Sequence, residues 1–225
     1  MDYEWVRRSV GVLKRQLLRC DESMPIGHWN WDASRTHRYE FGLRLAEREI
    51  RDFESQNSVR LPSEYRDFLV NLGNGGAGPG YGVFPLGKMN GVSGQTEFDE
   101  FYIGTLSIPF PHTQEWSCDK AALDWDAECN TDVQDEHEII WKERSFAHFN
   151  PKYIDGAIPI ADLGCGQSLL LVVTGSELGN LWYDDRADHV GISPMLKDGN
   201  RVRFNQWYTG WLNCALDQCA KDAQQ

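Results

Sequence analysis

Four side chains that could carry acid–base or metal chemistry lie close together in WYDDRADH, residues 182–189. They are the carboxylates of Asp184, Asp185 and Asp188 and the imidazole of His189. Such a cluster can transfer protons or hold a metal ion, but this one lacks a matched nucleophile and a recognised ligand spacing. An aspartate that follows a strand commonly forms a turn by bonding its own backbone. The cluster therefore has three interpretations: a catalytic site, an accessible acidic rim that binds a partner, or a structural turn.

A second combination, Cys118, Cys129 and His137, contains side chains that bind zinc. A zinc site would need a fourth ligand and closer spacing than these residues have. The six cysteines are scattered, with no C-x-x-C pair, so we expect reduced thiols. We expect no catalytic residue, no bound metal and no cofactor.

The glycine-rich stretch NLGNGGAGPGYG, residues 71–82, could instead indicate a nucleotide site. Residues 73–78 match the dinucleotide fingerprint G-x-G-x-x-G, and residues 82–89 come within one residue of a P-loop. These loops bind phosphate because a strand leads into the turn and the N-terminus of a helix follows it. Here a helix leads in and a strand leads out, so the helix dipole opposes phosphate. We interpret the glycines as a structural turn.

Charge favours a protein partner over a nucleic acid. The chain has a net charge of −12 and a pI near 4.9, whereas nucleic-acid-binding proteins usually carry a basic surface. Residues 119–138 hold eight carboxylates and one lysine, a net −7, which would attract a basic partner at long range. The candidate partner-binding residues are Asp124, Trp125, Asp126, Glu128, Asp132, Asp135, Glu136, Asp184 and Asp185. The alternative is that this stretch is a solvated loop, as most charge runs are.

Apolar spacing predicts four helices that must position these residues. The first runs over residues 5–20, and the second places Leu43, Ala46, Ile50 and Phe53 on one face and ends near Glu54. The third, within residues 61–73, has Pro62 in its first turn and ends at Gly73, where we expect a left-handed backbone. The last covers residues 204–216.

Between these helices lie short segments rich in β-branched and aromatic residues, which predict strands. They are YGVFPL, FDEFYIG, EIIW, AIPIAD, SLLLVVTG and NLWYD. Helices first, strands next and one closing helix predict an α+β fold with a mostly antiparallel or mixed sheet, the N-terminal helices and the C-terminal helix packing on it. No segment is long and apolar enough to cross a membrane, and the charged N-terminus argues against export, so we expect a cytoplasmic protein.

The stretch LPSEYRDFLVNLGNGGAGPGYGVFPL resembles the signature of the SUKH superfamily, the Smi/Knr-type domains. The shared features are Leu61-Pro62, an amphipathic helix, Asn74-Gly75-Gly76, Tyr81-Gly82 and Pro85-Leu86. AIPIADLGCGQSLLLVVTGSELGNLWYDD is similar to the central hairpin of the family, and RFNQWYTGWLNCAL to its closing helix. The resemblance implies one domain over residues 1–225, with a family core at about 38–110 and 150–220. Residues 1–35 would be an extra N-terminal helix and connector, and residues 112–140 an acidic insertion.

Bacterial members of this family are mostly immunity proteins, which bind and neutralise the toxin domains of polymorphic or contact-dependent systems, often nucleases. Fungal members are regulatory or scaffolding proteins in cell-wall assembly. The resemblance therefore implies a non-enzymatic protein that blocks a cognate toxin domain, and we expect it to be a monomer. The alternatives are a scaffold or regulator that joins cellular proteins, and an enzyme that uses the cluster at residues 184–189.

Overall fold

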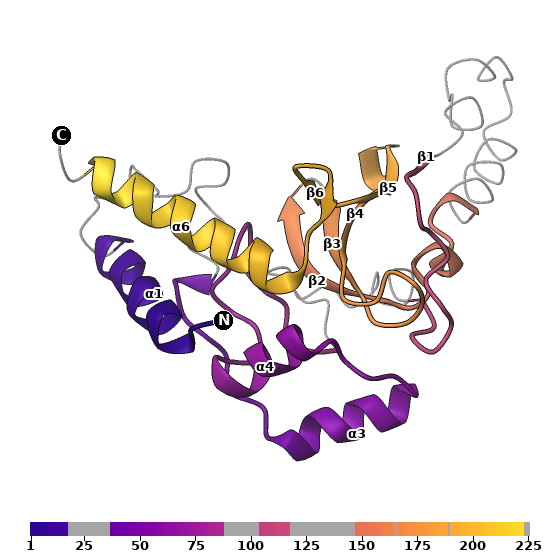
Figure 1. Ribbon diagram of the computed structural model, residues 1–225, viewed down its shortest axis with the longest axis horizontal. Coiled ribbons are helices and arrows are strands. Elements are labelled where there is room, and N and C mark those ends of the chain that lie inside the picture. The colour runs from indigo at the N-terminus through magenta and orange to yellow at the C-terminus, as the bar shows by residue number, and fades with distance from the viewer. Residues whose placement is uncertain (18–36, 88–103, 118–146, 165, 189, 223–225) are drawn as a thin grey trace, which may run out of the picture.

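Four helices and a five-stranded antiparallel sheet form most of the part of the chain that the computed structural model describes (Figure 1). The described residues are 1–17, 37–87, 104–117, 147–164, 166–188 and 190–222. The helices are α1 (Tyr3–Leu17), α3 (Glu47–Asn57), α4 (Ser63–Asn71) and α6 (Phe204–Asp222). The α+β fold class expected from the sequence is thus confirmed.

The second predicted helix begins later than its apolar spacing indicated. Ala46 has an extended backbone, and its amide donates to the Glu49 carboxylate, so the helix starts at Glu47. Leu43 lies before the helix and is 91% exposed. Only Ile50 of the predicted face is buried, with Phe53 half-buried. The prediction was wrong because it extended the periodicity through residues that only lead into the helix.

The sheet has the strand order β1-β5-β4-β3-β2, and every pairing is antiparallel. The strands are β1 (Trp116–Ser117), β2 (Ala157–Gly164), β3 (Gln167–Val172), β4 (Leu181–Asp185) and β5 (Gly191–Pro194). A short ribbon of β6 (Leu196–Lys197) and β7 (Asn200–Arg201) precedes α6, and single 3-10 turns form η3 (Pro151–Ile154) and η4 (Arg186–Asp188). Three of the predicted strands are present: AIPIAD forms most of β2, SLLLVVTG overlaps β3, and NLWYD overlaps β4.

Two other predicted strands lie mainly or wholly outside the described residues, FDEFYIG except for its last residue and EIIW throughout. YGVFPL forms single bridges instead of a strand: Val83 pairs with Gly76 and with Ala161 of β2. The short strands β1 and β5 were not predicted, because two to four residues show too little alternation to be recognised.

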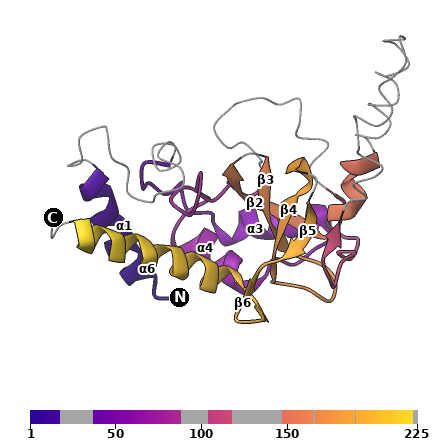
Figure 2. The same ribbon diagram turned by 90° about the horizontal axis from the view of Figure 1, so that it is seen from above.

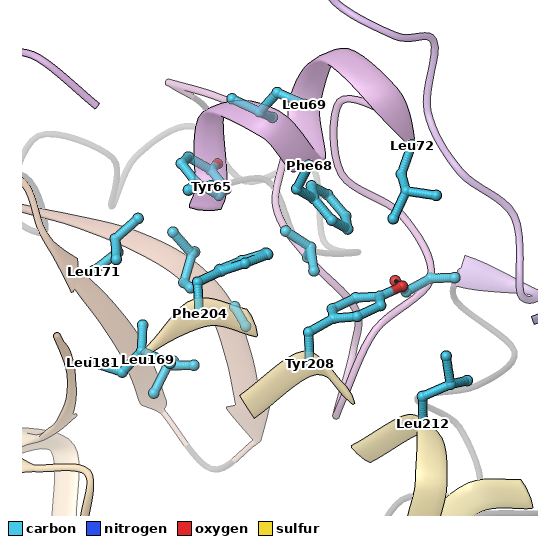
Figure 3. Close-up of a cluster of buried hydrophobic side chains, with 14 of the residues drawn as sticks. Tyr65, Phe68, Leu69, Leu72, Leu169, Leu171, Leu181, Phe204, Tyr208 and Leu212 are labelled. Atoms are coloured by element: carbon cyan, nitrogen blue, oxygen red, sulfur yellow. Dashed lines mark hydrogen bonds between the residues drawn. The ribbon is translucent and has the colours of Figure 1, made fainter. Parts of the chain in front are cut away.

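The main core lies where α4 and α6 meet one face of the sheet (Figure 3). Phe68 of α4 packs against Phe204 and Tyr208 of α6, with ring centroids 5.1 and 5.2 Å away. Leu169, Leu171 and Leu181 come from the sheet. Alternate residues of the same strands form a second cluster on the opposite face, with Leu170, Val172, Trp182 and Ile192. Both faces of the sheet are thus covered.

The sheet stands at one end of the molecule, and α1 packs against the distal half of α6 at the other (Figures 1 and 2). Val6, Val10 and Leu13 are the buried side chains of α1. Leu212, Ala215 and Cys219 are buried on α6 within the same cluster. The amphipathic patterns of the first and last predicted helices therefore bury their apolar faces together.

The glycine turn after α4 differs from the prediction at its first residue. The left-handed glycines are Gly75 (φ 79°) and Gly76 (φ 103°), whereas Gly73 has no positive φ. Gly73 is required for space, because a Cβ there would overlap the carbonyl oxygen of Gly42 and lie 2.9 Å from the Cβ of Phe41. The expected left-handed cap at Gly73 was wrong because the helix ends in an ordinary right-handed residue, Leu72.

Candidate partner-binding site

Asp184 at the end of β4 is held by an arginine two residues later. The Arg186 guanidinium donates from Nε to Oδ1 and from Nη2 to Oδ2 of Asp184, both at 2.7 Å. The Arg186 amide also donates to Asp184 Oδ1 at 3.3 Å. This last bond is the aspartate turn that the sequence predicted. The side chains of Asp184 and Arg186 are only 6% and 1% exposed.

The accessible rim expected at Asp184 is therefore not present, because its carboxylate is buried and neutralised by Arg186. The carboxylate of Asp184 is engaged in this buried ion pair, an environment that favours a structural role for it. His189, its proposed catalytic neighbour, lies outside the described residues. Sequence reasoning missed the role of Arg186, although an Asp-x-Arg spacing at a strand end was a signal that could have suggested the pair.

Asp185 at the end of β4 lies on the same row of the sheet as Ser117. It pairs with Gly191 of β5, and Gly191 pairs in turn with Ser117 of β1. Two strand spacings of about 4.8 Å place Ser117 roughly 10 Å from Asp185. Asp185 is half-buried, and its Oδ1 has no hydrogen-bond partner among the described residues. The sheet thus brings Asp185 near Ser117, the last described residue before the acidic stretch.

Two segments flank residues 118–146, and we call residues 110–117 the first arm and residues 147–154 the second arm. They contact each other through aromatic rings. Trp116 stacks on Tyr153 with 4.3 Å between centroids. His112 donates from Nε2 to the carbonyl oxygen of Tyr153 at 2.8 Å. Because the arms touch each other and the sheet, they form one closed base.

The second arm also contacts η4 directly. His148, which is buried, donates from Nε2 to the carbonyl oxygen of Arg186 at 2.7 Å. On the opposite side of the corner, Trp116 and Ser117 pair with Ile192 and Gly191 of β5. Ser117 and His148, which flank residues 118–146, are therefore both held beside the same β4–η4–β5 connection.

The electrostatics of this base favour a neutral imidazole. Burial lowers the pKa of His112, and the nearby Arg186 charge lowers it further, against the hydrogen bond to Tyr153, which raises it. A protonated His112 would add a second buried cation close to Arg186. Besides the Asp184–Arg186 pair, the charged side chains of the base are therefore Glu115 and Lys152, both exposed, with the Lys152 ammonium 5.0 Å from the centre of the Tyr153 ring.

Most of the other candidate residues lie outside the described residues. These are Asp124, Trp125, Asp126, Glu128, Asp132, Asp135 and Glu136, together with Cys118, Cys129 and His137. Their contact with a partner stays a prediction. Within the described part of the chain, no group of three or more metal-binding side chains comes together.

The amides of the glycine turn are bonded within the protein. Asn74 N donates to Leu43 O, Gly76 N to Val83 O, and Ala77 N to Glu40 O, at 2.7–2.9 Å. The turn is entered from the C-terminus of α4 and leads to the bridge at Val83. A phosphate needs free amides at a helix N-terminus, so these amides are not placed to bind one.

The chain was compared with models of known protein families. The model of the SMI1 / KNR4 family (SUKH-1) matches residues 44–194, about two thirds of the chain. The chain belongs to the SMI1 / KNR4 family. Neither curated proteins nor solved structures gave a significant match.

Membership of SUKH-1 supports an immunity-protein-like role in general, in which the domain interacts with a toxin protein. The family consists generally of non-catalytic immunity or regulatory proteins. The matched span contains α3, α4 and the whole five-stranded sheet, whereas α1 and α6 lie outside it. Among the described helices, none is long and apolar enough to span a bilayer.

Proposed function

We propose that this SUKH-1 protein binds a cognate toxin domain, a nuclease, and blocks its active site or substrate groove. The observation that carries the proposal is the net −7 of residues 119–138, which lie in the sequence between Ser117 and His148, two residues held at the same corner of the sheet. A nuclease groove is basic because it holds a phosphate backbone, so a carboxylate-rich segment can occupy it in place of nucleic acid.

The residues next to the segment support the same proposal. Ser117 pairs with Gly191, which also pairs with the half-buried Asp185, and Asp188 of η4 is exposed at the same corner. Long-range attraction between such a surface and a basic toxin raises the association rate. Rapid association matters for a protein that must silence a toxin before the toxin damages its host.

The proposal is tested by protection from a toxin domain. The gene next to this one should encode a large secreted protein with a C-terminal toxin domain, and that domain is the one to express. Cells that make the toxin domain alone should die, and cells that also make this protein should survive. Purified protein should inhibit the nuclease at one-to-one stoichiometry.

Two results would count against the proposal. Failure to protect cells, with the protein folded and abundant, would remove the inhibitory role. Tight binding without any loss of toxin activity would favour the scaffold or regulator instead. A control with a sequence-unrelated nuclease should show neither protection nor inhibition.

A further inference from the structure

Arg186 contacts three consecutive residues of the second arm. Its Nη1 lies 3.5 Å from the carbonyl oxygen of His148 and 3.3 Å from that of Asn150, and it donates toward both. The Phe149 ring lies 5.8 Å from the guanidinium carbon. The backbone carbonyl of Arg186 accepts the hydrogen bond from His148 Nε2. Arg186 therefore contacts each of residues 148–150 of the second arm.

Arg201 makes a parallel set of contacts with the first arm. Its Nη2 donates to the carbonyl oxygen of Thr113 at 2.6 Å. Its guanidinium lies 5.1 Å from the Trp182 ring, and its Nε donates to Glu177 at 2.8 Å. Burial raises the pKa of Glu177, but the hydrogen bonds from Arg201 and Asn180 outweigh it, and the net shift is downward. Glu177 is therefore a carboxylate that holds Arg201 in place.

The two arginines share one design. Each is paired with a carboxylate and lies over an aromatic ring. Each also donates from one guanidinium nitrogen to the backbone of one arm, Arg186 to two carbonyl oxygens and Arg201 to one. Arginine suits this task because its planar fork can bind a carboxylate and still donate elsewhere. A buried ion pair gives little net stability compared with apolar residues of similar size. Two apolar side chains could fill the same space as Asp184 and Arg186, but they could not make the hydrogen bonds from Arg186 to the second arm.

We propose that Arg186 and Arg201 are positioning residues, which fix the two arms flanking residues 118–146 so that the partner-binding segment starts from a rigid base. The assignment of that segment to partner contact rests on the function proposed above. A segment whose ends are fixed loses less conformational entropy on binding than one whose ends move. The arms therefore affect partner binding without touching the partner.

The test needs variants that release an arm without leaving a buried charge. Arg186→Met alone would strand the Asp184 carboxylate, which is costly. The double variant Asp184→Leu with Arg186→Met removes both charges and all guanidinium contacts, while the carbonyl of residue 186 remains for His148. Arg201→Met serves for the first arm. Arg66→Met is the matched control, because Arg66 pairs with Glu47 and Glu54 away from both arms.

Hydrogen exchange of the full chain provides the first readout. The amides to follow are Tyr153 N, bonded to Asn150 O, and Phe110 N, bonded to Thr174 O. We expect the Asp184/Arg186 double variant to speed exchange at residues 150–155 at least tenfold, with β2 and β3 unchanged. Arg201→Met should do the same at residues 110–117, and Arg66→Met at neither arm. Unchanged exchange in the arms, or an equal rise throughout the chain, would overturn the proposal.

Association kinetics with the toxin domain from the neighbouring gene provide the second readout. We expect the double variant to weaken binding about tenfold, as preorganisation is lost, while its unfolding midpoint stays within the range of Arg66→Met. Arg186→Lys, which keeps the positive charge but not the planar fork, should recover part of the loss. Wild-type affinity in a variant with loosened arms would refute positioning. Failure of the wild-type protein to bind would instead refute the proposed function, and the exchange result would still decide whether the arginines fix the arms.

Discussion

Gly73 shows how closely the chain segments around the glycine turn approach one another. Its φ is not positive, so alanine could adopt the backbone, but a Cβ would overlap the Gly42 carbonyl oxygen. We expect Gly73→Ala to lower the free energy of unfolding by about 1–3 kcal/mol, the usual effect of overpacking. Urea unfolding measures the change.

Gly210 in α6 is the matched control for Gly73. A Cβ there meets no atom within 4 Å, and its φ is not positive. Gly210→Ala should raise the free energy of unfolding by about 0.5–1 kcal/mol, because alanine favours the helix. Equal effects of the two substitutions would show that close approach is not the reason for glycine at position 73.

His37 should make the free energy of unfolding depend on pH. Burial lowers its pKa from 6.5 to about 4, and its neutral Nδ1 accepts the amide hydrogen of Tyr39 at 3.0 Å. The unfolded chain binds a proton near pH 6.5, whereas the folded chain binds it only near pH 4. Stability is thus unaffected above pH 6.5 and falls as the pH drops through this window, by roughly 3 kcal/mol in total.

The measurement compares unfolding free energies at pH 7 and pH 4.5 for the wild-type protein and His37→Gln. The variant should lose about 2–3 kcal/mol less between these two pH values, because glutamine does not titrate. His112 contributes a shift of the same sign in both proteins and cancels in the comparison. An identical pH dependence in the two proteins would exclude His37 as the cause.

At the scale of elements, the pairing of α1 with α6 should contribute to the stability of the whole fold. Leu13 is fully buried in this contact, whereas Val12 beside it is 41% exposed. We expect Leu13→Ala to cost about 2–5 kcal/mol and Val12→Ala less than about 0.5 kcal/mol. Thermal unfolding followed by circular dichroism distinguishes them. A small effect of Leu13→Ala would mean that α1 is detached from the cooperative unit.

The helices and long strands were predictable because each repeats its apolar pattern over several residues. Val6, Val10 and Leu13 recur on one face of α1, and β3 is a run of buried leucines and valines. The start of α3 was not predictable, because it depends on the cap at Ala46. The two-residue strand β1 was not predictable either, because it depends on pairing with β5. Patterns of one sequence segment do not contain such long-range information.

The same limit applies to the candidate site. The sequence indicated an aspartate turn at residue 184, which is a local feature, and the structure has it. The burial of Asp184 depends on Arg186 and on residues 148–150, some 36 positions earlier in the chain. An acidic side chain that is predicted to be exposed can therefore be buried. Only the tertiary contacts show which acidic side chains are buried.

At the scale of the whole molecule, the position of charge should matter more than its amount. Changing Asp124, Asp126, Asp132 and Asp135 to asparagine takes the net charge from −12 to −8. Changing the exposed residues Glu4, Asp52, Asp198 and Asp217 to their amides gives the same −8. We expect the first set to slow association with the toxin domain about tenfold or more and to flatten its dependence on salt.

The second set should change the association rate far less, because those carboxylates lie on α1, on α3, in the β6–β7 turn and on α6. Stopped-flow measurements over a range of salt concentrations separate the two sets. Equal slowing would mean that only the total charge steers the encounter. No slowing in either set would remove residues 118–146 from the interface.

The closed base that the two arms form has a consequence for how such a protein can diversify. Trp116, Ser117 and His148 are held by groups outside that segment, and the entropy of closing a loop rises by only about 0.6 kcal/mol for each doubling of its length. The segment can therefore be lengthened, shortened or replaced with little effect on the rest of the chain. A lineage facing a new toxin could exchange this one segment and keep its scaffold, and a protein engineer could graft a foreign recognition loop between the same two arms.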